Sequence, residues 1–224
     1  MKNIIITIDG PAGAGKTDTA KLVAKRLNLI HYNSGYSYRA ITLALINNNL
    51  INKDYNSKEI VKFVNEINIK NKGNTVFLDD EDVTAQLKTS QIDANVPEVA
   101  KIGHIRNKTK EILLDFATSG VGLVVEGRDI GTVVLPHADV KIFLTASLDI
   151  RALRRLEQIS NLSFSEVYES IKERDDIDSS REIAPLKMPE DSFLLDNTDL
   201  TKEETVEHIV GIARGLKKIR NIEE

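Results

Sequence analysis

The chain has 224 residues, of which 41% are hydrophobic, and 30 basic against 34 acidic residues give a formal net charge of −4. This length and composition exclude a disordered chain and fit one α/β domain that carries insertions. The sequence contains no cysteine, which excludes disulfides and thiolate metal sites and suits a cytoplasmic protein, and its acidic balance argues against a nucleic-acid partner.

Short aliphatic runs that alternate with helical patterns predict an α/β fold with one five-stranded parallel sheet flanked by helices. The predicted strands are Ile4–Ile8, Asn28–Tyr32, Leu123–Val125, Val140–Leu144 and Phe193–Leu195. The predicted helices are Lys16–Leu27, Ser37–Asn48, Pro97–Ala117, Ile150–Gln158, Ser163–Asp175 and Lys202–Lys217. The last helix opens with the capping-box pattern Thr201-Lys-Glu-Glu204.

One segment, from Asn49 to about Gln91, breaks this alternation and is interpreted as an insertion beside the main sheet, which leaves residues 1–48 and 92–224 as the core. It contains a short helix near Ser57–Asn65, and Asn74–Lys88 reads as strand, acidic turn and strand. The acidic residues Asp79–Asp82 predict a solvated turn; a metal site is the alternative, but the spacing is not that of a calcium loop.

The first apolar run is too short for a signal peptide, and no later stretch approaches the length of a membrane span. We therefore expect a soluble, unexported protein with no membrane partner. The four histidines are scattered without ligand spacing, which argues against a zinc site.

Polar and charged residues directly follow the predicted strands. In a parallel sheet with right-handed crossovers, the loops after the strands lie along one edge, so we expect these residues to converge there. In chain order they are a glycine-rich loop, Asn33-Ser34-Gly35, Glu126-Gly127-Arg128-Asp129, the group Arg151, Arg154 and Arg155, and Asp196-Asn197-Thr198.

The glycine-rich loop fits the phosphate-binding pattern G-x-x-x-x-G-K-[ST] at every position and lies between a predicted strand and a predicted helix. Its backbone N–H groups would cradle phosphates, with Lys16 on the outer phosphates of ATP and the Thr17 hydroxyl on Mg²⁺. The alternative is a chance glycine-rich turn. The predicted ATP-binding residues of this segment are Gly10, Pro11, Ala12, Gly13, Ala14, Gly15, Lys16, Thr17 and Asp18.

A GTPase switch is disfavoured because the chain contains neither an N-K-x-D guanine motif nor a D-x-x-G switch element. Asp18 is unusual after the threonine of such a loop. Its carboxylate suits the positive end of the helix dipole, but it would lie close to the phosphates.

Several arginines lie on or near the predicted edge of the sheet, where transfer of a phosphoryl group between two anions would need their charge. Arginine suits this role because its planar fork binds phosphate through two hydrogen bonds and is always charged. A solvated surface role is the alternative for any one of them. They are Arg39, Arg106, Arg128, Arg174, Arg181 and the group Arg151, Arg154 and Arg155.

Four segments together resemble the bacterial cytidylate kinase family, over about Ile4 to Ile209. The resemblance implies transfer of a phosphoryl group from ATP–Mg²⁺ to CMP or dCMP, giving the diphosphate and ADP, in pyrimidine metabolism. It also implies an enlarged monophosphate-binding insertion, here the 49–91 segment, and a lid at about 150–182. The segments are Gly10–Lys16, Ser34-Gly35-x-x-Tyr38-Arg39, Gly127-Arg128-Asp129-Ile-Gly-Thr-Val-Val134 and Arg174-Asp175-x-x-Asp178-x-x-Arg181-x-x-Ala184-Pro185-Leu186.

The resemblance also implies individual roles. Ser34, Arg106 and Asp129 would face cytosine, whose amino group a carboxylate can accept. Arg39, Arg128 and Arg181 would hold the phosphate of CMP, and Arg174 and Asp178 its ribose. In the lid, Arg151, Arg154 and Arg155 would close over the phosphates of ATP. The implied catalytic residues are Lys16, Arg128, Arg154 and Arg181, and family members are often monomeric.

Three residues depart from the family pattern: Asn33 replaces a common Asp, Pro97 stands at a frequent serine, and Ile177 replaces a frequent arginine. Alternatives therefore stay open. The acceptor could be another small metabolite such as shikimate, or the chain could be an ATP-binding regulatory module that has lost catalysis. Asp129 could also serve only to cap a helix.

Overall fold

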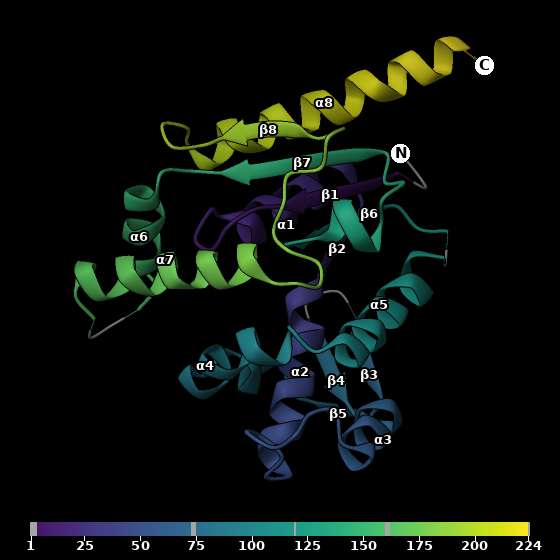
Figure 1. Ribbon diagram of the computed structural model, residues 1–224. Coiled ribbons are helices and arrows are strands. Elements are labelled where there is room, and N and C mark those ends of the chain that lie inside the picture. Colours follow the sequence, from purple (N-terminus) through teal and green to yellow (C-terminus); the bar gives the residue numbers. More distant parts are fainter. Residues whose placement is uncertain (1–3, 73–74, 119, 160–161, 224) are drawn as a thin grey trace. The chain divides into compact units, whose positions relative to one another are not determined.

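A computed structural model describes residues 4–72, 75–118, 120–159 and 162–223 (Figure 1). The chain divides into two compact units. The first unit comprises the residues up to His31 and from Val121 onward, and the second unit is Tyr32–Gly120. The segment 49–91, predicted as an insertion, falls entirely within the second unit, which extends beyond it on both sides.

The predicted five-stranded sheet is confirmed. Its order is β2-β6-β1-β7-β8, and the pairs β1–β6, β1–β7 and β7–β8 are parallel. The second strand begins two residues later than predicted, because Asn28 ends the preceding helix in the left-handed conformation, at φ 55°. The strands are β1 (Ile5–Asp9), β2 (Ile30–Asn33), β6 (Leu123–Gly127), β7 (Val140–Thr145) and β8 (Phe193–Asp196).

Two helices of the first unit, α1 (Lys16–Leu27) and α8 (Lys202–Glu223), pack against each other and against the sheet; Figure 1 shows α8 in yellow along β7 and β8. Their apolar residues join those of the strands in one core, including Val23 and Leu27 of α1 and Ile209 of α8. The predicted capping box is confirmed, since the Glu204 carboxylate accepts the Thr201 N–H at 2.8 Å and the Thr201 hydroxyl accepts the Glu204 N–H at 3.2 Å.

Helices α6 (Leu148–Leu156) and α7 (Phe164–Ser180) pack on each other through a small cluster that contains Ala152, Val167 and Ile171. The predicted end of the second of these at Asp175 was wrong, because α7 continues to Ser180. The extra turn carries Asp178, whose carboxylate lies 3.7 Å from the Arg174 guanidinium one turn earlier. This pair within the helix, and the hydrogen bond of 2.8 Å that Arg128 donates to Asp178, stabilise the extra turn of a helix that has no strong stop signal.

The second unit contains mainly helices and one three-stranded antiparallel sheet of order β3-β4-β5. Its core gathers apolar residues of nearly every element, among them Ile41, Leu45, Ile60, Leu87 and Ile92. The elements are α2 (Ser34–Asn47), α3 (Lys58–Glu66), β3 (Ile69–Lys72), β4 (Thr75–Leu78), β5 (Glu81–Asp82), the 3₁₀ helix η1 (Thr84–Lys88), α4 (Ser90–Val99) and α5 (Gly103–Ala117).

The single helix predicted over Pro97–Ala117 was wrong. Its first residues belong to α4, which Thr89 caps, and Ile102 adopts an extended conformation before α5 begins. The Arg106 guanidinium donates to the Ala100 carbonyl at 2.9 Å and so satisfies an acceptor at the end of α4. This long side chain replaces the hydrogen bonds that a continuous helix would have made.

The predicted strand, acidic turn and strand over Asn74–Lys88 was partly wrong; Asn74 itself lies outside the described residues. The acidic turn is present and exposed, with Asp79 and Asp80 at positive φ, but the strand after it has only two residues before η1. The partner strand β3 was missed, because its polar sequence Ile69-Lys-Asn-Lys72 lacks an apolar run. No helix in the described part of the chain is long and apolar enough to cross a membrane.

Candidate functional site

The phosphate-binding loop connects β1 to α1, as the sequence predicts. Gly13 and Gly15 have φ of 75° and 84°, a conformation that side-chain-bearing residues rarely adopt. A Cβ on Gly10 would lie 1.9 Å from the Leu144 carbonyl oxygen, so glycine is required for this approach to β7. The loop therefore has the backbone geometry that directs N–H groups into a concave, anion-binding turn at the start of a helix.

Lys16 is buried within this loop, and its ammonium group donates to the Pro11 carbonyl at 2.6 Å. Burial and the neighbouring Arg128 guanidinium lower the pKa of Lys16 well below its usual range, while Glu126, Asp178 and Asp9 act in the opposite direction. These charged side chains thus lie close enough to Lys16, near the carboxyl ends of β1 and β6, to change its pKa. A bound phosphate would add negative charge there and favour the ammonium form.

Glu126 of β6 joins the loop to β2. Its carboxylate accepts a hydrogen bond of 2.8 Å from the Thr17 hydroxyl, and its other oxygen lies 2.8 Å from Nε2 of His31. Glu126 and His31 are both buried. Hydroxyl and carboxylate oxygens are the ligands that Mg²⁺ prefers, so the donor set of Thr17 and Glu126 fits that cation.

Asp9, at the end of β1, holds the loop that carries the Arg128-Asp129 pair. Its two carboxylate oxygens accept the N–H groups of Ile130 at 2.9 Å and Gly131 at 2.7 Å. These residues open η2 (Ile130–Val134), so Asp9 caps this short helix. The Asp129 carboxylate makes no capping hydrogen bond to η2, which leaves little support for a mere capping role of Asp129.

The ionisation of Asp9 should make the free energy of unfolding depend on pH. Burial raises the pKa of Asp9 from 3.8 to about 6, against the two backbone N–H groups that lower it. Between these values the folded state holds a proton that the unfolded state has lost, so this contribution is complete below 3.8 and is lost as pH rises through about 6. Relative to Asp9→Asn, we expect the wild-type free energy of unfolding to fall by up to about 3 kcal/mol between about pH 4 and 7, at about 1.4 kcal/mol per pKa unit. Urea denaturation across this range measures the difference, and parallel curves would contradict it.

Asp178 of α7 gathers three of the predicted acceptor-binding arginines. Its carboxylate accepts from Arg128 Nε at 2.8 Å and lies 3.7 Å from Arg174 and 3.6 Å from Arg181. Burial opposes ionisation of Asp178, but the three guanidinium groups outweigh it and lower its pKa. Arg181 also donates to the Ala184 carbonyl at 2.8 Å. The structure thus brings these three arginines together around Asp178, and the charge of one of them, Arg128, also acts on Lys16.

The arginines of α6 differ in their surroundings. Arg154 donates to the Asn197 side chain at 2.9 Å and to its carbonyl at 2.8 Å, and Asn197 in turn donates to the loop carbonyl of Ala14 at 3.2 Å. Arg151 is buried and donates to the carbonyls of Ala12 and Ala146. Arg155 contacts Gln158 within its own segment, at 3.4 Å. Arg151 therefore contacts the phosphate loop directly, and Arg154 is connected to it through Asn197.

Asp18 is directed to α8, since its carboxylate pairs with the Lys202 ammonium at 2.9 Å. Its charge is thereby partly compensated on the surface between α1 and α8.

Ser34, Arg39 and Arg106 belong to the second unit. Ser34 opens α2 directly after the N-cap Asn33, whose side chain accepts the Gly35 N–H at 2.9 Å. Asn33 thus provides the cap that an aspartate would also provide. Arg39 donates to the Leu87 carbonyl at 2.7 Å and to Asp93, and buried Arg106 lies over the Tyr38 ring at 5.6 Å. Pro97, the second departure from the family pattern, lies inside α4.

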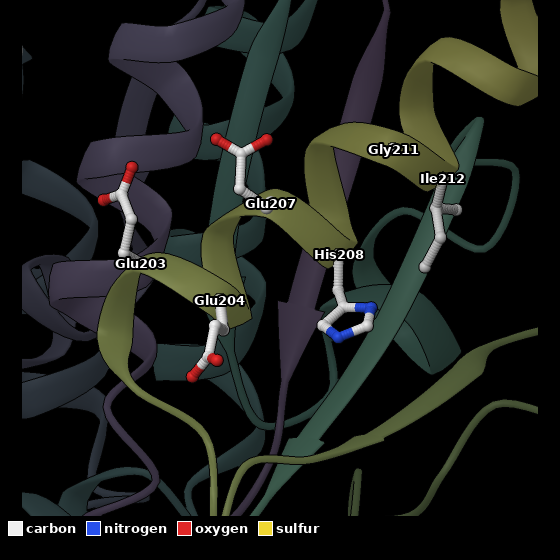
Figure 2. Close-up of a pocket in the computed structure, with 6 residues that line it drawn as sticks. All are labelled: Glu203, Glu204, Glu207, His208, Gly211 and Ile212. Atoms are coloured by element: carbon white, nitrogen blue, oxygen red, sulfur yellow. The ribbon is translucent and has the colours of Figure 1, made fainter.

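An open depression on α8 is unrelated to the phosphate loop. Figure 2 shows Glu203, Glu204, Glu207 and His208 projecting from successive turns of this helix around it. Arg26 of α1 pairs with Glu203 and Glu207. Among the described residues, no group of three or more His, Cys, Asp and Glu side chains could hold a metal ion. The acidic lining would repel phosphate, so this depression is not the candidate nucleotide site.

The sequence predicts that Glu126 and Asn197 lie along the edge that forms the site, and Asp175 belongs to a quoted motif, but no individual role was predicted for these residues or for Asp9. Glu126 had a usable signal, because a carboxylate that follows a buried strand in a phosphate-loop protein is a common Mg²⁺ partner. The other contacts join residues distant in sequence: Asp175 accepts the Ala12 N–H from 163 positions away, and Asn197 reaches Ala14 across 183. Short motifs contain no such information.

The model of the cytidylate kinase family matches residues 6–215 of this chain. Proteins named cytidylate kinase are its relatives at high coverage. That of Fusobacterium nucleatum is 43% identical over 213 residues, 93% of this chain and 96% of the relative. That of Caldanaerobacter subterraneus is 44% identical over 211 residues, 91% and 92% of the two chains. That of Clostridium botulinum is 38% identical over 218 residues, 96% and 99%.

Solved structures agree at the level of the fold alone. A gluconokinase from Sinorhizobium meliloti has a TM-score of 0.52 at 12% identity and covers 99% of this chain and 98% of its own. An uncharacterised protein from Eubacterium ventriosum has a TM-score of 0.51 at 13% identity, covering 93% and 97%.

Proposed function

Because the chain belongs to the cytidylate kinase family, we propose that it transfers the terminal phosphoryl group of ATP to CMP or dCMP, giving ADP and CDP or dCDP. The observation that carries this proposal is the buried Lys16 of the phosphate loop together with the hydrogen bond of 2.8 Å that Arg128 donates to Asp178, whose charges act on Lys16. A loop built to bind one phosphate chain lies beside arginines suited to bind a second anion. Transfer between two nucleotides needs both.

The donor side is the phosphate loop. Backbone N–H groups between Gly10 and Thr17, the start of α1 and the Lys16 ammonium would bind the phosphates of ATP. The oxygens of Thr17 and Glu126 would hold Mg²⁺, which supplies positive charge to the phosphates when bound. Lys16, at 7% exposure, would act where little water screens its charge.

The acceptor side is the set of residues that the family resemblance assigns to CMP. We propose that Arg128 and Arg181 bind the phosphate of CMP, together with Arg39, and that Arg174 and Asp178 contact its ribose. Ser34, Arg106 and Asp129 would read cytosine, whose amino group suits a carboxylate and whose ring acceptors suit an arginine. The fork of each arginine can neutralise charge that develops on the phosphoryl group during transfer.

The reaction needs no covalent enzyme intermediate, because positioning and charge neutralisation supply the catalysis. Lys16, Arg128, Arg154 and Arg181 are the proposed catalytic residues. We further propose that the segment 49–91 helps to bind the monophosphate and that residues 150–182, with Arg151, Arg154 and Arg155, close over ATP and exclude water. A cytoplasmic monomer suits these small nucleotide substrates.

An assay with ATP–Mg²⁺ and a panel of acceptors tests the proposal. We expect kcat/KM for CMP and dCMP to exceed the values for AMP, UMP and dTMP, and no transfer to shikimate. A preference for another nucleotide would remove the cytosine assignment. ATP binding without transfer to any acceptor would instead indicate a module that has lost catalysis.

Asp129 should determine base preference. With Asp129→Ala we expect the preference for CMP over UMP, measured as a ratio of kcat/KM, to fall by about 10- to 100-fold, since a good base contact is worth roughly 1–3 kcal/mol. Asp129→Asn should shift the preference toward UMP, because an amide can donate to the uracil O4. Reduced turnover with an unchanged ratio would show that Asp129 does not read the base.

A further inference from the structure

Two charged side chains from α6 and α7 hold both main-chain groups of one residue in the phosphate loop. The Asp175 carboxylate accepts the Ala12 N–H at 2.9 Å, and the Arg151 guanidinium donates to the Ala12 carbonyl at 3.1 Å. Asp175 and Arg151 also pair directly with each other. Ala12 therefore has both its donor and its acceptor occupied by residues from outside the loop.

Two guanidinium nitrogens of Arg151, Nε and Nη1, donate hydrogen bonds to oxygen atoms of the protein. Its Nε donates to the Ala146 carbonyl at 2.9 Å, and Nη1 serves both Ala12 and Asp175. The residue is 8% exposed. The backbone of α6 also meets the loop closely, since a Cβ on Gly13 would lie 2.9 Å from the Arg151 carbonyl oxygen. Arg151 is thus packed into the wall of the loop.

We propose that Asp175 is a positioning residue for the phosphate donor, acting through the Ala12 peptide and through Arg151. This role rests on the proposed function of the loop as the ATP site. A glycine-rich loop has many accessible conformations, and ordering it on binding costs affinity. Asp175 and Arg151 hold Ala12 in one orientation beforehand, which fixes where the following N–H groups of the loop point.

The same helix also carries the carboxylate that gathers the acceptor arginines. Asp178 lies about one turn beyond Asp175 on α7, and its partner is Arg128 rather than the loop. The two carboxylates therefore have different roles. Asp175 orients the loop that binds the phosphate donor, and Asp178 orients the arginines that bind the acceptor. Loss of Asp175 should weaken the ATP side and leave the CMP side largely intact.

Calorimetric binding of a non-hydrolysable ATP analogue with Mg²⁺ to the full chain tests this role in the absence of CMP. We expect Asp175→Ala to raise the Kd for the analogue about tenfold, since a hydrogen bond to a charged group is lost. Asp175→Asn keeps an oxygen for the Ala12 N–H, so we expect its Kd to rise only about two- to threefold, because charge-assisted hydrogen bonds are about twice as strong as neutral ones. KM for CMP should stay within about twofold of wild type in both, given the separate partner of Asp178.

Asp176→Ala is the matched control, since Asp176 is the exposed neighbour on the same helix and is expected to bind the analogue like wild type. The role of Asp175 would be overturned if Asp175→Ala bound the analogue as tightly as Asp176→Ala, or more tightly. Equal binding would mean that the contact with Ala12 does not order the loop, and tighter binding would mean that the negative charge of Asp175 weakens phosphate binding more than the contact strengthens it. Equal losses of analogue and CMP affinity would also overturn it. Wild type that binds the analogue but does not phosphorylate CMP would contradict the proposed function alone.

Discussion

Replacing Lys16 by methionine is expected to lower kcat for CMP phosphorylation by roughly 10²- to 10³-fold, the usual loss when one preorganised group that stabilises transition-state charge is removed. Methionine keeps the buried, unbranched stem and removes only the ammonium group, so the loop should stay packed. Lys16 lies within the loop that would hold the phosphates, and its Nζ already contacts the Pro11 carbonyl at 2.6 Å. Steady-state kinetics with ATP and CMP measure the effect.

Lys25→Ala is the control for this substitution, because Lys25 is an exposed lysine on the same helix α1. It should show wild-type kinetics and a wild-type Tm. If Lys16→Met retained kcat within about tenfold of wild type, the loss would be smaller than that expected for a catalytic charge. Such a result would show that Lys16 does not stabilise the transition state.

The second large effect concerns Arg181. Replacing it by lysine is expected to lower kcat/KM for CMP by roughly 10²-fold, because each hydrogen bond to a charged group contributes about 1.5–3 kcal/mol and lysine cannot reproduce the planar fork. Lysine keeps the positive charge near Asp178, which lies 3.6 Å from the guanidinium. Arg181→Ala would leave that buried network short of a cation, with a cost of about 3–5 kcal/mol in stability.

The kinetic effect of Arg181→Lys should be specific to the acceptor. KM for ATP should change little, because Arg181 donates to the Ala184 carbonyl and pairs with Asp178, which also binds Arg128. Arg214→Ala, an exposed arginine of α8, is the control. Similar losses for CMP and for an unrelated acceptor would contradict a role in binding the CMP phosphate.

The parts of the fold that the sequence predicts well are those with strong local signals. The strand before the phosphate loop, β1, is buried on both faces. The helix Lys16–Leu27 has the predicted bounds because Gly15 opens it and Asn28 ends it in left-handed conformations. The capping box at Thr201 is also a local signal, because Thr201 and Glu204 lie three residues apart. In each case the residues that determine the boundary are neighbours in the chain.

The boundaries that the sequence predicts poorly depend on side-chain contacts that no local pattern encodes, or on a polar strand such as β3. The break between α4 and α5 is stabilised by Arg106, whose guanidinium donates to the Ala100 carbonyl six residues earlier. The last turn of α7 is stabilised by Asp178, which pairs with Arg174 of the same helix and accepts from Arg128, 50 residues away.

The family motif contains Asp175 as well as Arg181, but the motif does not reveal what Asp175 contacts. Its hydrogen bond with the Ala12 N–H joins residues 163 positions apart and follows only once α7 lies against the phosphate loop.

The most direct measurement of the central claim follows a labelled phosphorus atom through one turnover. The enzyme is incubated with ATP labelled at its γ-phosphate, Mg²⁺ and CMP, and the products are separated. We expect the label to be recovered in the β-phosphate of CDP, with one ADP formed for each CDP, and we expect Lys16→Met and Arg181→Lys both to suppress this transfer. Label recovered as inorganic phosphate, or CDP formed without it, would contradict direct transfer between two nucleotides.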